Sequence, residues 1–155
     1  MYATRVTRHV QAPPRSVYRA LTDPEAIAAW RVPDHMTAHV HVFEAREGGA
    51  FRVSLSHDDG SGTGKSGDGT DTYRGHFAAL VPDSQVVEVL AFETDDAALA
   101  APMTLTTTLT PAGGGTDVEI LHEGVPDGIP REDNERGTRM ALDRLARLVA
   151  DHRAV

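Results

Sequence analysis

The sequence ends in one long amphipathic segment, and this feature constrains the fold more than any other. Residues 130–151 begin with a proline, carry acidic residues in their first turns and have Arg144 and Arg147 towards their end. This arrangement is typical of a helix. Its apolar side chains recur at spacings of three and four along one face: Thr138, Ala141, Leu142, Leu145, Leu148 and Val149. A helix of about 22 residues spans roughly 33 Å, and this face of it must be buried.

The middle of the chain alternates apolar and polar residues with a period of two, which predicts antiparallel strands. Turn-forming segments rich in glycine, proline or aspartate separate these strands, and residues 112–115 form a glycine-rich hairpin turn. We expect strands over residues 37–45, 50–56, 72–81, 85–93, 103–110 and 116–124.

The N-terminal part predicts one more strand, over residues 4–10, and two short helices. The first helix, over residues 13–21, starts at a pair of prolines. The second has Asp23 as its N-cap and Pro24 at its first position, and it ends near Arg31 because Val32 precedes a proline. The 155 residues therefore predict one α+β domain, in which a curled antiparallel sheet of about seven strands wraps around the long C-terminal helix.

Composition excludes several classes of function. The 15 basic and 23 acidic residues give a formal charge of −8, which disfavours nucleic acid and anionic membranes as partners. The absence of cysteine excludes disulfides, thiolate zinc sites and cysteine nucleophiles. No transmembrane span or signal peptide is evident, so we expect a cytoplasmic protein. We also expect a monomer or homodimer that uses no cofactor.

A glycine-rich loop, Gly60 to Ser66, resembles a phosphate-binding loop but fails its pattern. The position of the first glycine is Asp59, and turn residues rather than a helix follow Lys65. The aspartates of this region also miss the spacing of a calcium-binding loop. We therefore interpret it as a plain connecting loop.

Most histidines are interpreted as surface residues. His39 and His41 lie on one strand face and could supply two metal ligands. The opposite face holds Ala38, Val40 and Val42, so the pair is expected to point outward, and we predict no metal site. Four further histidines show no partner pattern and are assigned to the surface: His9, His35, His76 and His152.

His57 and His122 differ, because alternation places both on apolar strand faces. An inward histidine can act as a general acid or base or hydrogen-bond a ligand, whereas the alternative is a core-edge histidine satisfied by the backbone. Tyr73 and Thr107 share the inward parity of their strands and could add hydroxyls. No known catalytic motif is present.

Two further residues carry alternative interpretations. Trp30, the only tryptophan, could line a ligand pocket or serve only as a packing anchor. Gly137 costs about 1 kcal/mol relative to alanine inside a helix. Either the helix approaches the sheet closely there, which we favour, or the missing side chain opens cavity volume.

Several segments, in this order, resemble the START-like helix-grip (SRPBCC) superfamily, and within it the homologues of the heat-shock-protein ATPase activator. They are APPRSVYRALTDPEAIAAW, FEAREGGAFRVSL, YRGHFAALVPDSQVVEV, TPAGGGTDVEI, HEGVPDGI and GTRMALDRLARLVADH. The resemblance implies a helix-grip fold with a hydrophobic cavity between the sheet and the C-terminal helix. In this superfamily such a cavity typically takes a lipid-like, polyketide-like or other aromatic molecule.

We therefore expect a protein that binds an apolar or aromatic small molecule in this cavity. One alternative is a cyclase-type or hydrolase-type enzyme that uses His122 or His57 in the same cavity, and another is a protein-binding module resembling the chaperone ATPase activators. The residues expected to contact the ligand are Trp30, Val53, Leu55, Tyr73, Phe77, Leu105, Thr107, Ile120, His122, Thr138, Ala141 and Leu145.

Overall fold

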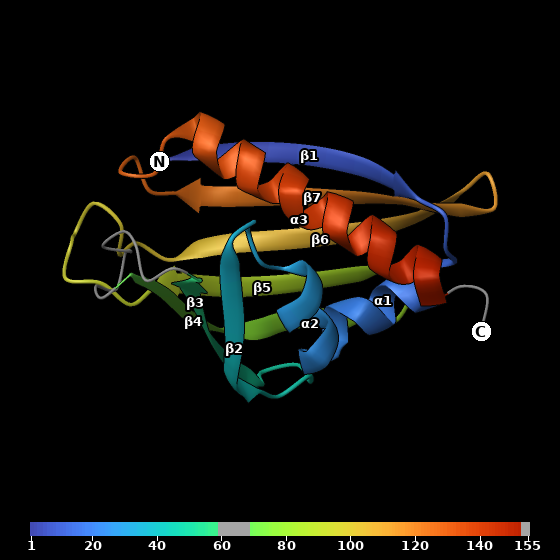
Figure 1. Cartoon of the computed structure of the whole chain (residues 1–155), viewed down its shortest axis with the longest axis horizontal. Helices are drawn as coiled ribbons and strands as arrows, with labels where there is room; N and C mark the ends of the chain where they lie inside the picture. The colour runs from blue at the N-terminus through green and yellow to red at the C-terminus, as the bar shows by residue number, and fades with distance from the viewer. Residues whose placement is uncertain (59–68, 153–155) are drawn as a thin grey trace.

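Seven strands form one antiparallel sheet in the computed structural model, which describes residues 1–58 and 69–152 (Figure 1). The strands are β1 (Tyr2–Val10), β2 (Met36–Phe43), β3 (Ala50–His57), β4 (Thr70–Val81), β5 (Gln85–Phe92), β6 (Met103–Ala112) and β7 (Gly115–Val125). Their order in the sheet is β1-β7-β6-β5-β4-β3-β2. The predicted sheet is confirmed, whereas the loop that contains Lys65 lies outside the described residues.

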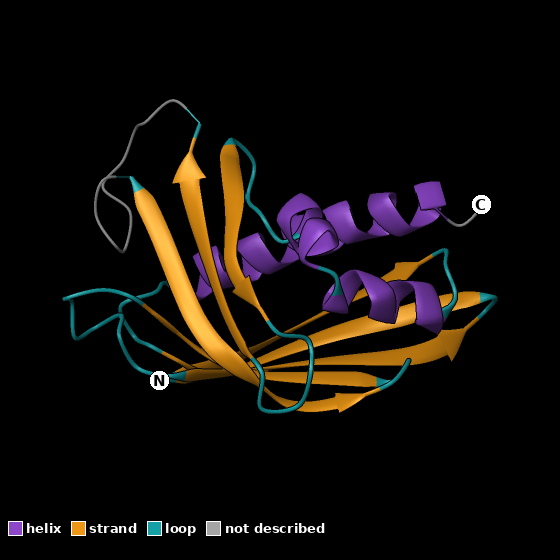
Figure 2. Cartoon of the chain, turned by 90° about the horizontal axis from the view of Figure 1, so that it is seen from below, coloured by secondary structure: helices purple, strands orange, loops and turns teal. Residues whose placement is uncertain are grey.

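Three helices cover one side of this sheet: α1 (Pro14–Thr22), α2 (Pro24–Trp30) and α3 (Arg131–His152). The Asp23 side chain accepts a hydrogen bond of 3.0 Å from the Glu25 backbone N–H and so caps α2, as predicted. Figure 2 shows the sheet curving around the helices, with α3 as the longest of them. The α+β helix-grip arrangement is confirmed. None of the described helices is both long enough and apolar enough to cross a membrane.

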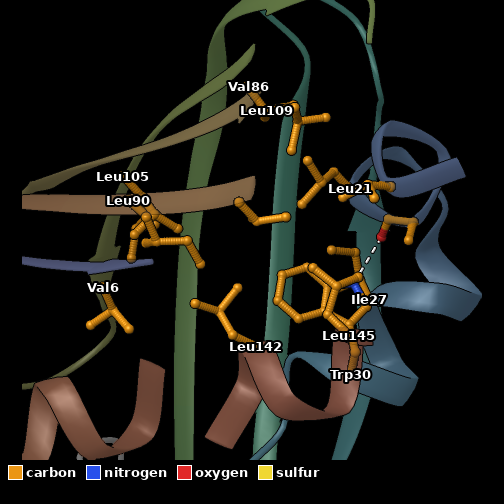
Figure 3. Packing of buried hydrophobic residues seen from close by; sticks show 14 of the residues in the cluster. Val6, Leu21, Ile27, Trp30, Val86, Leu90, Leu105, Leu109, Leu142 and Leu145 are labelled. Carbon is orange, nitrogen blue, oxygen red and sulfur yellow. Dashed lines mark hydrogen bonds between the residues drawn. The ribbon is translucent and has the colours of Figure 1, made fainter. Parts of the chain in front are cut away.

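The hydrophobic core fills the space between the sheet and the C-terminal half of α3. Leu142, Leu145 and Val149 are buried there, as the apolar stripe predicted. The two short helices pack against this half of α3, and α1 contributes Leu21 and α2 contributes Ile27 and Trp30 to the same cluster (Figure 3). The first turns of α3 carry no such fully buried residues, so the two halves of this helix have different surroundings.

Strand β2 departs from strict alternation. The pairing of β2 with β3 shifts register between Val40 and Val42, which is the mark of a bulge. The bulge turns Val42 outward, where it is 41% exposed, and Phe43 packs against the core instead. The expectation that Val42 points inward was therefore wrong.

Candidate functional site

A cavity of about 270 Å³, partly open to solvent, lies between the sheet and the N-terminal half of α3. Five neighbouring strands, β3 to β7, contribute apolar side chains to it, and the end of α2 closes one side. Its lining consists of Trp30, Arg31, Val32, Pro33, Leu55, Asp71, Tyr73, Leu90, Phe92, Leu105, Ile120, His122, Ile129, Asp133, Asn134, Gly137, Thr138 and Ala141. The wall is therefore mainly apolar, with a small set of polar groups.

The structure divides the sequence-predicted ligand contacts into two groups. Those that line the cavity are Trp30, Leu55, Tyr73, Leu105, Ile120, His122, Thr138 and Ala141. Val53, Phe77, Thr107 and Leu145 point to the same side but are buried in the core and do not line the cavity. Phe77, for example, packs its ring against Phe43 and Phe51, at centroid distances of 5.4 and 5.2 Å.

His122 is the polar centre of the cavity wall. Its Nδ1 lies 3.0 Å from the Asn134 side-chain nitrogen, and the Asn134 oxygen accepts a hydrogen bond of 2.5 Å from the Thr4 hydroxyl. The Asn134 amide thus donates to Nδ1, which leaves the ring proton on Nε2. This Nε2 is buried and has no partner in the described structure.

The charge state of His122 follows from its surroundings. Burial, together with the positive charge of Arg31, lowers the pKa of His122 to about 4. At neutral pH the ring is therefore uncharged. The residue lines the cavity, and its one N–H, on Nε2, has no partner among the described residues.

A buried ion pair borders the same space. The Arg31 guanidinium donates to the Glu88 carboxylate at 2.7 Å, and Glu88 is only 4% exposed. Burial alone would lower the pKa of Arg31, but the adjacent Glu88 carboxylate raises it above the ordinary value, so the arginine stays charged. Because the two charges compensate each other, the pair adds no net charge to the cavity.

Tyr73 lies next to this ion pair. The Arg31 guanidinium carbon is 5.5 Å from the centre of the Tyr73 ring. The Tyr73 hydroxyl is buried without a partner in the described structure. Burial raises the pKa of Tyr73, although Arg31 acts in the opposite direction. The phenol therefore keeps its proton and offers a second polar contact to the cavity.

The other histidines do not contribute to this site. His57 is half-buried at the end of β3, two residues beyond the cavity-lining Leu55, and is not part of the lining. His39 and His41 are exposed, as predicted, with ring centroids 4.5 Å apart. Among the described residues, no group of three or more potential metal ligands comes together.

The surface assignments made for the other histidines also fit. His35 and His76 are exposed, and the half-exposed His9 pairs with Asp117 at 2.7 Å. The side chain of His152 lies outside the description.

The structure also decides the alternatives for Trp30 and Gly137. Trp30 fills both roles: it is 2% exposed, its indole N–H donates to the Ala20 carbonyl at 2.8 Å (Figure 3), and it lines the cavity. A Cβ atom on Gly137 would meet nothing within 4 Å. The favoured explanation for Gly137, close approach of helix and sheet, is therefore wrong, and the missing side chain opens the cavity.

Sequence reasoning missed Arg31, Glu88 and Asn134. For two of them the sequence contained an indication. Glu88 occupies the inward-facing position of β5 between Val86 and Leu90, where an apolar residue is expected. Asn134 precedes Thr138 by one helical turn and so lies on the same face of the helix. Arg31 follows α2 in irregular backbone, where no periodicity predicts the direction of a side chain.

The family model described as "Activator of Hsp90 ATPase homolog 1-like protein" matches residues 11–150. The chain belongs to this family. Among curated proteins, none matches the chain. The family assignment therefore confirms the resemblance seen in the sequence motifs.

Solved structures of similar proteins share the fold of this chain. Protein CV1439 from Chromobacterium violaceum is 34% identical, with a TM-score of 0.86 and 96% of each chain covered. The AHSA1-like protein from Aeromonas hydrophila is 18% identical, with a TM-score of 0.75 over 97% of this chain and 93% of that one.

A third similar structure is DynU16, a putative protein in the dynemicin biosynthetic locus, at 20% identity and a TM-score of 0.68. It aligns with 99% of this chain and 49% of that one. At this identity the likeness to DynU16 shows a shared fold.

Proposed function

We propose that this member of the Activator of Hsp90 ATPase homolog 1-like family binds an apolar, aromatic small molecule between its sheet and α3. The observation that carries the proposal is the cavity of about 270 Å³, with its mainly apolar wall and with two lining residues, His122 and Tyr73, whose buried polar atoms lack a partner in the described part of the chain. Ligand sites typically combine such a wall with a few placed polar groups, in volumes of about 300 to 1,000 Å³. A cavity near the lower limit suits a ligand of one to three rings.

An enzymatic role in the same cavity is the second candidate, and the position of His122 in the cavity lining is the observation in its favour. The protonation pattern limits that role. Nδ1 of His122 already accepts from Asn134, and Nε2 carries the proton, so the neutral ring has no free lone pair for a general base. His122 is better suited to hold a ligand than to abstract a proton.

A protein-binding role receives less support from the surface. Among the described residues, the exposed large apolar side chains are Met1, Val42 and Val81. They lie on different strands or at the terminus, whereas a docking face requires a contiguous apolar patch. The interior cavity therefore remains the favoured site.

Binding is tested with N-phenyl-1-naphthylamine, a neutral aromatic probe whose emission rises in apolar surroundings. Because Trp30 is the only tryptophan and lines the cavity, saturable energy transfer from tryptophan to the probe reports that the probe is bound to the chain, and variants at Gly137 then locate it. We expect saturable transfer with one probe per chain. Native mass spectrometry of the purified protein then identifies any molecule that the cavity retains.

A matched pair of variants at Gly137 locates the probe. Gly137→Leu places a side chain in the open space beside this residue and should weaken probe binding at least tenfold. Gly137→Ala adds one methyl group and should leave most of the binding. Equal binding by wild type and Gly137→Leu would place the probe elsewhere, and the absence of saturable transfer would refute the proposal.

A further inference from the structure

Two residues that line the cavity each carry a buried polar atom with no hydrogen-bond partner in the described structure: Nε2 of His122 and the hydroxyl of Tyr73. Buried polar groups in folded proteins are nearly always hydrogen-bonded to protein, water or ligand. The two atoms lie on β7 and β4, which β6 and β5 separate in the sheet. They therefore mark two distinct positions along the cavity wall.

The hydrogen-bonding direction at the first position is fixed. Thr4 donates to the Asn134 oxygen, so the Asn134 amide nitrogen faces His122 Nδ1 and donates to it. His122 Nε2 must then carry the proton. What the cavity offers at this position is a donor, and the complementary ligand atom is an acceptor.

The charges that line the cavity favour a neutral acceptor. Among the described lining residues, Arg31 is the only arginine or lysine, and its charge is compensated by Glu88 at 2.7 Å. The other charged residues of the lining are Asp71 and Asp133. A carboxylate or phosphate ligand would thus enter a cavity that holds no uncompensated cation, and burial of such an anion is unfavourable.

We propose that the ligand is a neutral carbonyl compound, a ketone, ester or quinone on an apolar frame, whose oxygen accepts a hydrogen bond from His122 Nε2–H. A carbonyl oxygen accepts this bond without bringing a proton that itself needs a partner in apolar surroundings. This inference rests on the proposed function and adds the chemical class of the ligand.

Three naphthalenes of nearly the same shape test the inference, each measured by displacement of N-phenyl-1-naphthylamine. They are 2-acetylnaphthalene, a ketone; 2-isopropenylnaphthalene, its hydrocarbon counterpart; and 2-naphthoate, its anionic counterpart. We expect the ketone to bind about tenfold tighter than the hydrocarbon, as one net hydrogen bond provides, and at least tenfold tighter than 2-naphthoate. Equal binding of ketone and hydrocarbon, or tighter binding of 2-naphthoate, would overturn the inference.

Three variants assign the donor. His122→Phe keeps an aromatic ring but removes the N–H, and it should abolish the preference for ketone over hydrocarbon while the probe still binds. His39→Phe makes the same substitution at an exposed histidine outside the cavity lining and should leave the preference intact. Tyr73→Phe tests the other donor of the lining: loss of the preference in Tyr73→Phe with its retention in His122→Phe would assign the contact to Tyr73 and refute the role of His122.

A second measurement on the wild-type protein covers the case in which His122→Phe does not fold. The ketone labelled with 13C at its carbonyl should show a downfield carbonyl shift on binding, relative to the same ketone in hydrocarbon solvent. An unchanged shift contradicts the hydrogen bond. If the probe binds but no naphthalene displaces it, the carbonyl class is refuted and the proposed function stands, whereas failure of the probe itself refutes both.

Discussion

At the scale of single residues, His122 stands at the end of a series of hydrogen bonds that connects three elements of the fold. Thr4 on β1 donates to Asn134 on α3, which in turn donates to His122 on β7. These hydrogen bonds fix the tautomer of the imidazole and leave its remaining N–H without a partner among the described residues. A buried imidazole held neutral in this way makes the stability of the protein depend on pH.

The first prediction follows from the lowered pKa of His122. Its pKa is about 4 in the folded protein and near 6.5 in the unfolded chain. Between these values the unfolded chain binds the additional proton, so the free energy of unfolding falls as the pH drops from about 6.5 to 4. His122 should account for a loss of about 2 to 3 kcal/mol by pH 4.5.

Urea unfolding of wild type and His122→Phe at pH 7 and pH 4.5 measures this contribution. The carboxylates contribute alike to both proteins, so the difference between the two pH dependences isolates His122. Parallel pH dependences would show that His122 titrates normally in the folded state.

A second prediction concerns the Arg31–Glu88 ion pair. Arg31→Met leaves the Glu88 carboxylate buried and unpaired, and this should destabilise the protein by about 3 to 5 kcal/mol. The double variant Arg31→Met with Glu88→Leu removes both charges and should recover most of the loss. A double-mutant cycle in urea provides the test, and additive losses would mean that the two residues do not act as a pair.

At the scale of elements, the two halves of α3 differ in function: the C-terminal half packs in the core, and the N-terminal half lines the cavity. Leu145 in the C-terminal half is fully buried in the core, whereas Gly137, in the first half, faces open space. Leu145→Ala should therefore destabilise by about 2 to 5 kcal/mol, because it leaves a void between helix and sheet. Gly137→Ala should instead stabilise by about 0.5 to 1 kcal/mol, because alanine favours the helix and meets no neighbour.

The free energy of unfolding of both variants is measured by chemical denaturation. Each variant serves as the control for the other, because the two changes in stability are expected to have opposite signs. A loss below about 0.5 kcal/mol for Leu145→Ala would mean that this face of α3 is not packed. Destabilisation by Gly137→Ala would show that the helix does approach the sheet there.

The sequence predicted the elements well because each has an amphipathic period. The six strands of the middle region and the C-terminal helix were found within a few residues of their observed bounds. The bulge at Val42 could not be found, because an inserted residue leaves no mark on the composition of a strand. Alternation likewise placed Phe77 and Leu105 on the inner side, but it could not tell which of them faces the cavity.

That distinction arises at the scale of the whole molecule. The position of α1 and α2 under the C-terminal half of α3 decides which part of the inner surface is filled (Figure 1). Where these helices end, at Trp30 and Arg31, the cavity begins. The polar residues of the cavity lining also come from distant parts of the chain, Arg31, Tyr73 and His122, and only the tertiary structure brings them together.

The last prediction belongs to the complete fold, because a ligand that binds only the folded cavity must stabilise the whole chain. At a concentration of 100 times its Kd, such a ligand adds about 2.7 kcal/mol to the free energy of unfolding. For a chain of this size, that corresponds to a rise in Tm of roughly 5 to 10 °C. Differential scanning calorimetry with increasing 2-acetylnaphthalene should show this rise for wild type and Gly137→Ala. Gly137→Leu, in which the cavity is filled from α3, should melt at the same temperature with and without the ketone. An equal rise in all three proteins would mean that the ligand stabilises the fold from a site outside the cavity.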